Sequence, residues 1–466
     1  DETRADGRLG AIARRVGESR RDVQAAREEL ARVLLVQALG LAQIAIGAVA
    51  AIMTSTLNRV MVVELALPAT IPSVLVALHF AIQMSRAKFG FDSDRSPSRA
   101  PWILGGAIVL AIGGTLAAMA VSVASTRLML GLTLAFVAYA LIGVGMSAAG
   151  TALLAHVAEQ VEPRKLGAAA ALLWIMMIFG IAVTAGVSGQ LLDPFSFTRL
   201  VTVTAVVCLV AALLAAIAAW GSWGMRRPAL EKPAVAEGAG FRTTITDALK
   251  DQTTRRFAFF VFAAMLAYSA QDLILEPFAG RVFAMTPGES TKLGGLQHGG
   301  VMLGMLGAAL LSARVGSLRV WAAAGCVASA LSLLVLANAP WWGGVTLLKG
   351  TVFALGVANG VFAVGAIGSM MAMTAADTTR GTGIRLGVYG AAQAIAYGVG
   401  SLGGGVASDL TIAAMGDAAR GYVAVFGVEA VLFIVAAFMA LASTPSVSAR
   451  VMRDGRAGDV ILGAMR

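Results

Sequence analysis

The chain has 466 residues, of which 58% are hydrophobic and only 13% are charged, with a formal net charge of +10. A soluble protein of this length would have too few polar residues to cover its surface, so this composition excludes a soluble globular fold. Apolar runs of about 20 residues recur along the chain, and each is long enough to cross a bilayer. The sequence therefore predicts an all-α polytopic membrane protein.

The first segment, residues 1–33, is polar but carries apolar residues at helical spacing. It is too charged to contain the apolar core of a cleavable signal peptide. The spacing favours an amphipathic cytoplasmic segment on the membrane surface, and a solvated tail with little helix is the alternative. The residues that give the spacing are Leu9, Ile12, Val16, Val23, Ala26 and Leu30.

Twelve apolar segments follow, and we predict a membrane-spanning helix in each. They are residues 34–55, 65–85, 102–124, 128–154, 167–187, 200–220, 257–275, 294–313, 320–338, 345–371, 386–407 and 421–441. The central loop, residues 221–256, separates a first half (34–220) from a second half (257–441), and a tail follows (442–466). Two six-helix halves joined by such a loop are typical of the major facilitator fold. Cys208 and Cys326 lie inside apolar segments, so we expect buried free thiols.

The basic residues are distributed unevenly between the two sides of the predicted membrane. Of the 36 Lys and Arg residues, 29 lie on the side that carries both termini and six lie in the opposite loops. Basic loops stay in the cytoplasm, so we expect both termini there and the protein in the bacterial inner membrane. This bias accounts for the net charge and gives no reason to invoke nucleic acid as a partner.

The second predicted span carries its polar residues on one stripe. At about 100° per residue, these side chains fall within an arc of roughly 100°. A stripe facing lipid would not tolerate them, so we expect this face to look into the bundle. Its members are Glu64, Pro68, Pro72, Leu75, His79, Gln83 and Arg86. Before it, residues 58–64 are predicted to form a turn outside the membrane.

A weak internal repeat places charges at corresponding positions of the two halves. The run from Arg59 to Glu64 aligns with Gln271 to Glu276, and proline follows each run. We expect Asn58, Arg59, Glu64, Asp272 and Glu276 to lie at the outer mouth. Charges there are expensive unless paired, so Arg59 is predicted to pair with Asp272 or Glu276 across the halves. Four separately hydrated charges are the alternative.

The loop after the second span matches much of the major facilitator motif Gly-x-x-x-Asp-Arg-x-Gly-Arg-Arg/Lys. Gly90, Asp94, Arg95 and Arg99 occupy the motif positions, whereas Pro97 and Ser98 depart from it. We predict a gate built on Asp94 and Arg95, with an ordinary surface ion pair as the alternative.

Two of these runs resemble a known family. Residues 56–65 and 271–280 are similar to signatures of the bacteriochlorophyll-delivery (PucC/LhaA) family of the major facilitator superfamily. The loop after the second span departs from that pattern. His79, in Leu-His-Phe-Ala-Ile-Gln, looks more like a sister branch labelled bacteriochlorophyll synthase chain.

The resemblance implies a carrier that binds bacteriochlorophyll or a late precursor and delivers it to membrane partners. These would be antenna or reaction-centre polypeptides, or enzymes of pigment synthesis, beside the membrane lipids. It points to His79 as a ligand of the chlorin magnesium and to Gln83, His298 and Met302 as further pigment-binding residues. A buried, hydrogen-bonded His79 and a core-filling Met302 are the alternatives. We expect His156 to be solvated.

The sequence is also compatible with two other functions. One alternative is a secondary transporter of a small amphiphile, and another is a scaffold subunit that binds no pigment. Glu429 is the acidic residue near the middle of a predicted span, and we expect it to have a polar partner. Because ion-driven transport needs such residues, their scarcity favours the carrier. We find no enzyme motif and expect no free metal ion.

Overall fold

The computed structural model describes residues 35–94, 96–161, 166–222, 252–312, 315–376 and 382–443. Within these ranges all regular secondary structure is helical, and nine segments are long and apolar enough to cross a membrane. The first segment, Leu35–Glu64, includes the π-helices η1 (Ile52–Leu57) and η2 (Val60–Glu64). The other eight lie in α4 (Ala100–Ala124), α5 (Leu128–Gln160), α6 (Leu166–Leu191), α7 (Phe197–Ser222), α9 (Gln252–Phe283), α11 (Leu318–Trp342), α12 (Gly344–Ala376) and α14 (Ala418–Ser443).

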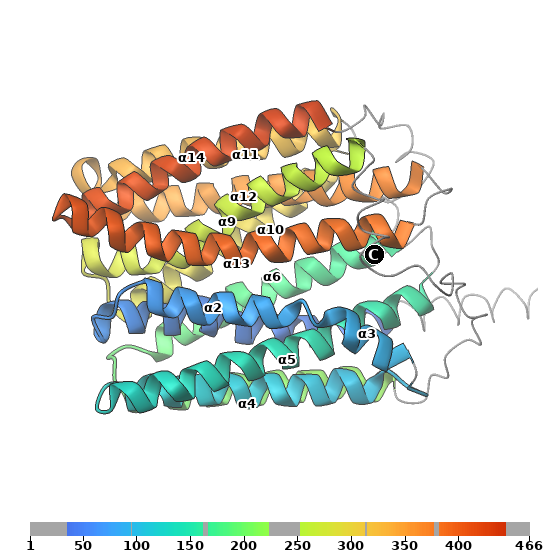
Figure 1. The fold of residues 1–466 in the computed structure, drawn as a ribbon, viewed down its shortest axis with the longest axis horizontal. Coiled ribbons are helices and arrows are strands. Elements are labelled where there is room, and N and C mark those ends of the chain that lie inside the picture. Colours follow the sequence, from blue (N-terminus) through green and yellow to red (C-terminus); the bar gives the residue numbers. More distant parts are fainter. Residues whose placement is uncertain are drawn as a thin grey trace, which may run out of the picture.

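Three more helices run alongside these nine: α2 (Thr70–Gln83), α10 (Pro287–Ser312) and α13 (Thr382–Met415) (Figure 1). The short α3 (Arg86–Asp94) lies at one end of the bundle. The chain is therefore a multispan membrane protein, as its composition predicts. The predicted segments 1–33, most of 221–256 and nearly all of 442–466 lie outside the described residues.

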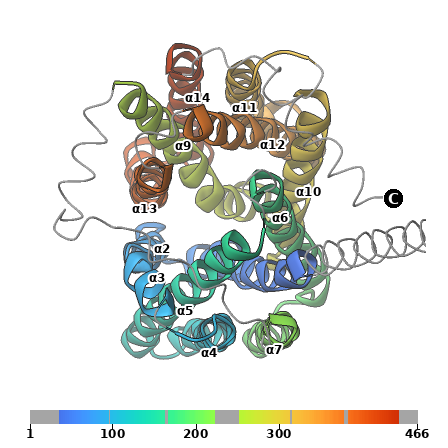
Figure 2. The same ribbon diagram turned by 90° about the vertical axis from the view of Figure 1, so that its right-hand side faces the viewer.

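The apolar core is divided between two large clusters of buried residues. One cluster comes from residues 35–218 together with Leu273, and the other comes from residues 257–440. The two parts of the chain meet where α2 packs on α13 and where α6 packs on α10 (Figure 2). A small third cluster seals the α6–α10 contact with Ile178, Val301 and Met305.

The predicted turn at residues 58–64 is wrong, because the first helix continues to Glu64. Val60, Met61 and Val62 are buried, so leaving the helix there would expose apolar side chains. The chain turns just afterwards, where Ala66 adopts a positive φ of 51°. A π-helix is wider than an α-helix and often marks a functional site.

Two further boundaries differ from the sequence prediction. Residues 86–94, predicted as part of a loop, form α3. The seventh predicted span, 257–275, belongs to the longer α9, so Glu276 lies within a helix, as Asp272 does. Hydropathy alone ends the span too early, because it takes no account of the burial of Glu276 among neighbouring helices.

Gly300 and Gly304 let α10 and α12 approach closely. A Cβ placed on Gly304 would lie 2.1 Å from the backbone oxygen of Val357, and one on Gly300 would lie 2.5 Å from that of Phe353. The two cysteines, Cys208 and Cys326, are buried and free, as predicted.

We predict that Gly304→Ala destabilises the protein by about 1–3 kcal/mol, because the added methyl group meets backbone that cannot rotate away. Gly307→Ala is the matched control on the same helix, since a Cβ there meets nothing within 4 Å. Thermal unfolding of the purified protein in detergent measures both variants. Equal unfolding temperatures for the two variants would contradict the close α10–α12 contact.

Candidate functional site

Side chains of the first helix bind the second part of the chain at one end of the bundle. Asn58 Nδ2 donates to Leu273 O at 2.5 Å, and the Ser55 hydroxyl donates to the Glu276 carboxylate. The hydroxyls of Thr56 and Thr291 lie 3.2 Å apart. We call this contact, formed by residues 55–70 with α9, α10 and α13, the seam.

Arg59 is 2% exposed and lies at the centre of the seam. It forms an ion pair with Glu64, which is 31% exposed, and its Nη2 donates to Met285 O at 2.5 Å. The predicted pairing of Arg59 with Asp272 or Glu276 is therefore wrong. The π-helix explains the difference, because its i to i+5 repeat places Glu64 directly over Arg59. Arg59 still joins the two parts of the chain, through a backbone carbonyl.

Two residues that sequence reasoning missed complete the seam. The Asp409 carboxylate of α13 accepts from Ala69 N at 2.9 Å, Thr70 N at 2.8 Å and Thr70 Oγ1 at 2.7 Å. It therefore caps the N-terminus of α2, whose own N-cap residue, Ala69, has no capping side chain. Arg281 Nη2 donates to Val62 O at 3.0 Å and more weakly to Leu67 O at 3.3 Å. The sequence signal for the role of Asp409 was the alanine at the N-cap of α2, because a helix without its own capping residue needs a cap from elsewhere in the chain.

We predict that Asp409→Ala loosens the seam, because losing a helix cap costs about 1 kcal/mol and frees two buried N–H groups. A cysteine at the buried Thr291 should then react about fivefold faster with a maleimide, the factor that corresponds to this energy.

The matched control is Asp417→Ala, which removes a local cap of α14, where Arg420 N donates to Asp417 Oδ1 at 2.7 Å. This control should leave the labelling rate unchanged. An unchanged rate in Asp409→Ala as well would show that the cross-chain cap does not hold the seam closed.

The part of the predicted stripe that lies in α2 faces the interior, because Pro72, Leu75, His79 and Gln83 are buried, whereas the outer members Glu64, Pro68 and Arg86 are exposed. His79 is 1% exposed, and its Nε2 lies 2.5 Å from Gln83 Nε2. Arg86 in turn donates to Gln83 Oε1. This chain of contacts is the arrangement of the alternative, a buried and hydrogen-bonded His79.

Aromatic rings connect His79 to the second part of the chain. The rings of His79 and Phe80 lie 5.0 Å apart, Phe80 and Tyr397 lie 5.1 Å apart, and Tyr397 and Tyr268 lie 6.0 Å apart. Tyr268 lies four residues before Asp272 on α9, so the two side chains share one face of that helix. Phe80, Tyr268, Tyr397 and Asp272 are only partly buried. We call this group of residues on α2, α9 and α13, with His298 of α10, the junction.

His298 and Asp272 form the end of the junction on α9 and α10. His298 Nε2 lies 3.9 Å from Asp272 Oδ1, and His298 Nδ1 lies 2.9 Å from Gly294 O. Their side chains are 10% and 21% exposed. Met302, four residues after His298 on α10, packs with Trp174 and Met177 of α6 against the α6–α10 cluster. Ring contacts thus run from His79 on α2 to the tyrosines of α13 and α9, and an ionic contact joins α9 to His298 on α10.

The loop motif gives a mixed result. Arg99 is buried and binds the Glu159 carboxylate at 2.7 Å and Ser93 Oγ at 2.7 Å, which anchors α3 and α4 to α5. Arg95 and the side chain of Asp94 lie outside the described residues, so the gate at that pair stays a prediction.

Two expectations about single residues are wrong. His156 is buried rather than solvated. Glu429 is 2% exposed, but its two carboxylate oxygens have no hydrogen-bond partner in the described part of the chain, although we expected one. Among the described residues, no group of three His, Cys, Asp or Glu could hold a metal ion.

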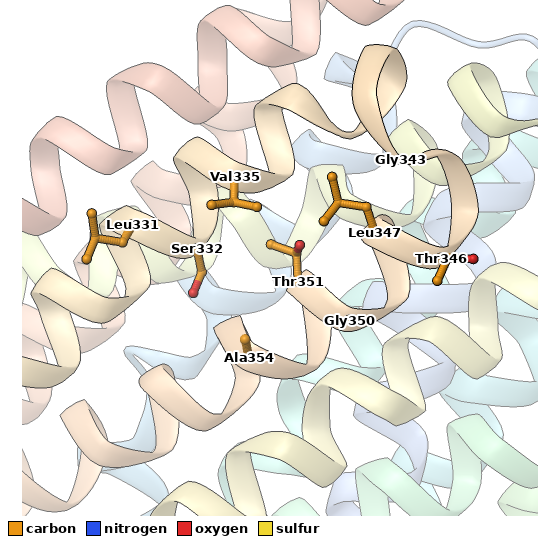
Figure 3. A pocket seen from close by; sticks show the side chains of 9 residues that line it. All are labelled: Leu331, Ser332, Val335, Gly343, Thr346, Leu347, Gly350, Thr351 and Ala354. Atoms are coloured by element: carbon orange, nitrogen blue, oxygen red, sulfur yellow. The ribbon is translucent and has the colours of Figure 1, made fainter.

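A surface groove of about 540 Å³ lies between α11 and α12 (Figure 3). Its lining is apolar, and the Ser332 hydroxyl donates to Ala328 O of its own helix at 2.8 Å. The described lining offers hydroxyl groups but no charged or aromatic side chain, so we place the candidate site at the junction. The lining residues are Leu331, Ser332, Val335, Gly343, Thr346, Leu347, Gly350, Thr351 and Ala354.

Comparison with known proteins identifies relatives over nearly the whole chain. The family model described as PUCC protein matches residues 56–446. The "Bacteriochlorophyll synthase 44.5 kDa chain" of Rhodobacter capsulatus is 46% identical, over 86% of this chain and 93% of that protein. "Protein PucC" of the same species is 30% identical, over 89% of this chain and 92% of that protein.

Solved structures with a similar fold are transporters. A bacterial homologue of the human lysosomal transporter Spinster, in an inward-facing and unoccupied conformation, has a TM-score of 0.65 at 16% identity. That match covers 90% of this chain and 99% of the other. The nucleoside transporter NupG has a TM-score of 0.64 at 18% identity, over 88% of this chain and 99% of that one. The fold is thus that of major facilitator transporters.

Proposed function

Because the chain belongs to the PUCC protein family, we propose that it binds bacteriochlorophyll or a late precursor in the membrane. It delivers this pigment to antenna or reaction-centre polypeptides or to pigment-synthesis partners. The junction is the observation that carries the proposal. It combines partly exposed aromatic rings, which suit a flat macrocycle, with two histidines and a carboxyl group that can fix its orientation.

The proposed role is that of a carrier without catalysis. One relative is called a synthase chain, yet the junction contains no arrangement of nucleophile, base and oxyanion donors for bond formation, nor the paired aspartate clusters that a prenyltransferase needs to hold magnesium diphosphate.

A second candidate is a secondary transporter of a small amphiphile. Asp272 and Glu276 lie inside α9, so the scarcity of buried acidic residues no longer argues against ion coupling. The likeness to transporter structures supports the same candidate. Transport that depends on an ion gradient, by protein that carries no pigment, would favour it over the carrier.

The proposal includes a membrane arrangement of twelve spans in two halves, 34–220 and 257–441. The nine apolar segments supply most of these spans, and α2, α10 and α13 supply the rest. Both termini and the central loop 221–256 face the cytoplasm of the inner membrane, because the basic residues gather on that side. The seam then lies on the outer side, and the protein is closed there.

We predict that Thr126→Cys, in the exposed turn between α4 and α5, reacts with an impermeant maleimide in intact cells. Lys88→Cys, exposed on α3, should react only after the membrane is opened. The native thiols are buried, so they add little background. If Lys88→Cys were labelled from outside and Thr126→Cys were not, the two sides of the membrane would be the reverse of those proposed.

We predict that protein purified gently from pigment-producing cells shows chlorin absorbance. Phe80→Ala should reduce the bound pigment about tenfold, since it removes aromatic surface worth about 1.5–3 kcal/mol on burial. Phe438→Ala is the control, because that ring is 69% exposed on α14, a helix that contributes no residue to the junction. Wild-type protein without chlorin absorbance would move the scaffold role ahead of the carrier.

A further inference from the structure

The two histidines of the junction differ in which ring nitrogen can bind a metal. A neutral imidazole carries a proton on one nitrogen and a lone pair on the other, and only the lone pair can ligate. The hydrogen bonds around each ring therefore decide which of the two histidines can serve as an axial ligand for a magnesium chlorin. This inference rests on the proposed function and concerns how the same site selects its pigment.

The lone pair of His79 is already used. Arg86 can only donate, so the Gln83 atom that it contacts must be the amide oxygen. The amide nitrogen of Gln83 then faces His79 Nε2 at 2.5 Å and donates to it. This arrangement leaves the proton on His79 Nδ1, which is buried and has no partner in the described residues. His79 could ligate magnesium only after this chain of three residues had broken.

His298 has the opposite arrangement. The atom opposite His298 Nδ1 is the backbone oxygen of Gly294, which can only accept, so Nδ1 carries the proton. The lone pair is then on Nε2. The nearest charged group to Nε2 is Asp272 Oδ1 at 3.9 Å, which is beyond hydrogen-bonding distance. A backbone carbonyl that holds the distal N–H is the usual support of a metal-ligating histidine.

The surroundings of His298 also suit a macrocycle. Met302, one turn further along α10, adds an adaptable apolar side chain that packs, with Trp174 of α6, against the α6–α10 cluster. Tyr268 shares the face of α9 that carries Asp272.

We propose that His298 Nε2 is the axial ligand of the bound pigment and that the site thereby selects magnesium-containing chlorins over magnesium-free ones. His79 acts as part of the wall through its contacts with Gln83 and Phe80. The ligand class is a magnesium tetrapyrrole, held by one imidazole and by aromatic and thioether side chains around the ring.

The test is a titration of the full-length protein in lipid nanodiscs with bacteriochlorophyll a and, separately, with bacteriopheophytin a, which lacks the metal. Wild type should bind the magnesium pigment at least about tenfold more tightly, in line with the effect of ligand support on metal affinity. His298→Leu should lose this preference while its affinity for bacteriopheophytin stays within about twofold. His298→Gln should keep part of it, since an amide oxygen is a weak ligand.

Two further variants separate ligation from other roles. His79→Leu should change the affinity for both pigments by the same factor, because a wall contact does not sense the metal. Asp272→Asn should keep the preference for magnesium, whereas it would mimic His298→Leu if His298 acted only as an ion partner of Asp272. The absorption band that reports the magnesium coordination number should change in His298→Leu alone.

Each remaining outcome is decisive. Equal affinities of wild type for the two pigments, or a preference that survives in His298→Leu, would overturn the ligand assignment while pigment binding stands. A preference lost in His79→Leu alone would move the ligand to His79. Failure of wild type to bind either pigment would overturn the proposed function and this inference together.

Discussion

Where a helix of a membrane protein becomes irregular, its free backbone N–H and C=O groups must form hydrogen bonds inside the protein. The structure depends on how the seam provides these hydrogen bonds. An unpaired backbone group in hydrocarbon costs several kcal/mol. The first helix ends in a π-helix, and the chain then turns at residues 65–69. Side chains from elsewhere in the chain, chiefly Arg281 and Asp409, satisfy the groups that this irregular stretch leaves open.

Backbone oxygens of the second part of the chain are in turn bonded by side chains of the first helix. Leu273 O and Met285 O accept hydrogen bonds from Asn58 and Arg59. A charge at such a depth is tolerated when it is paired, and Arg59 is paired with Glu64 and bound to a carbonyl. At the seam, the two parts therefore hold each other through charged side chains that bond to backbone atoms. A charge pair between the two parts lies at Lys292 and Asp193, whose Nζ and Oδ2 atoms are 3.4 Å apart.

Much of the fold could be predicted from the sequence because it rests on composition and periodicity. The apolar segments, the inward stripe Pro72–Gln83, the glycine contacts of α10 and the buried thiols all follow from patterns within about 20 residues. The family signatures lie in two short runs, and both belong to the seam. One reaches the seam through Asn58 and Arg59, and the other through Leu273 and Glu276.

The remaining features depend on partners that are distant in sequence. Asp409 lies about 340 residues from the helix that it caps, and its sequence neighbours give no sign of this role. The Arg59–Glu64 pair needs a π-helix, which periodicity does not reveal. The predicted span stops one residue short of Glu276, because hydropathy scores a carboxyl group as exposed, whereas Glu276 is buried within α9. Which nitrogen of His79 is free depends on Gln83 and Arg86 acting together.

The seam and the junction share one stretch of α9. Within ten residues, Asp272 interacts with His298, Leu273 O accepts from Asn58, Glu276 accepts from Ser55 and Arg281 donates to Val62 O. Pro277 lies inside this stretch and has no N–H, so the Leu273 carbonyl lacks its helical hydrogen bond and accepts from Asn58 instead. The first helix therefore holds α9 at the point where the proline weakens it. Because one stretch of α9 carries groups of both the seam and the junction, we expect a movement at the seam to reach Asp272 through the backbone of α9.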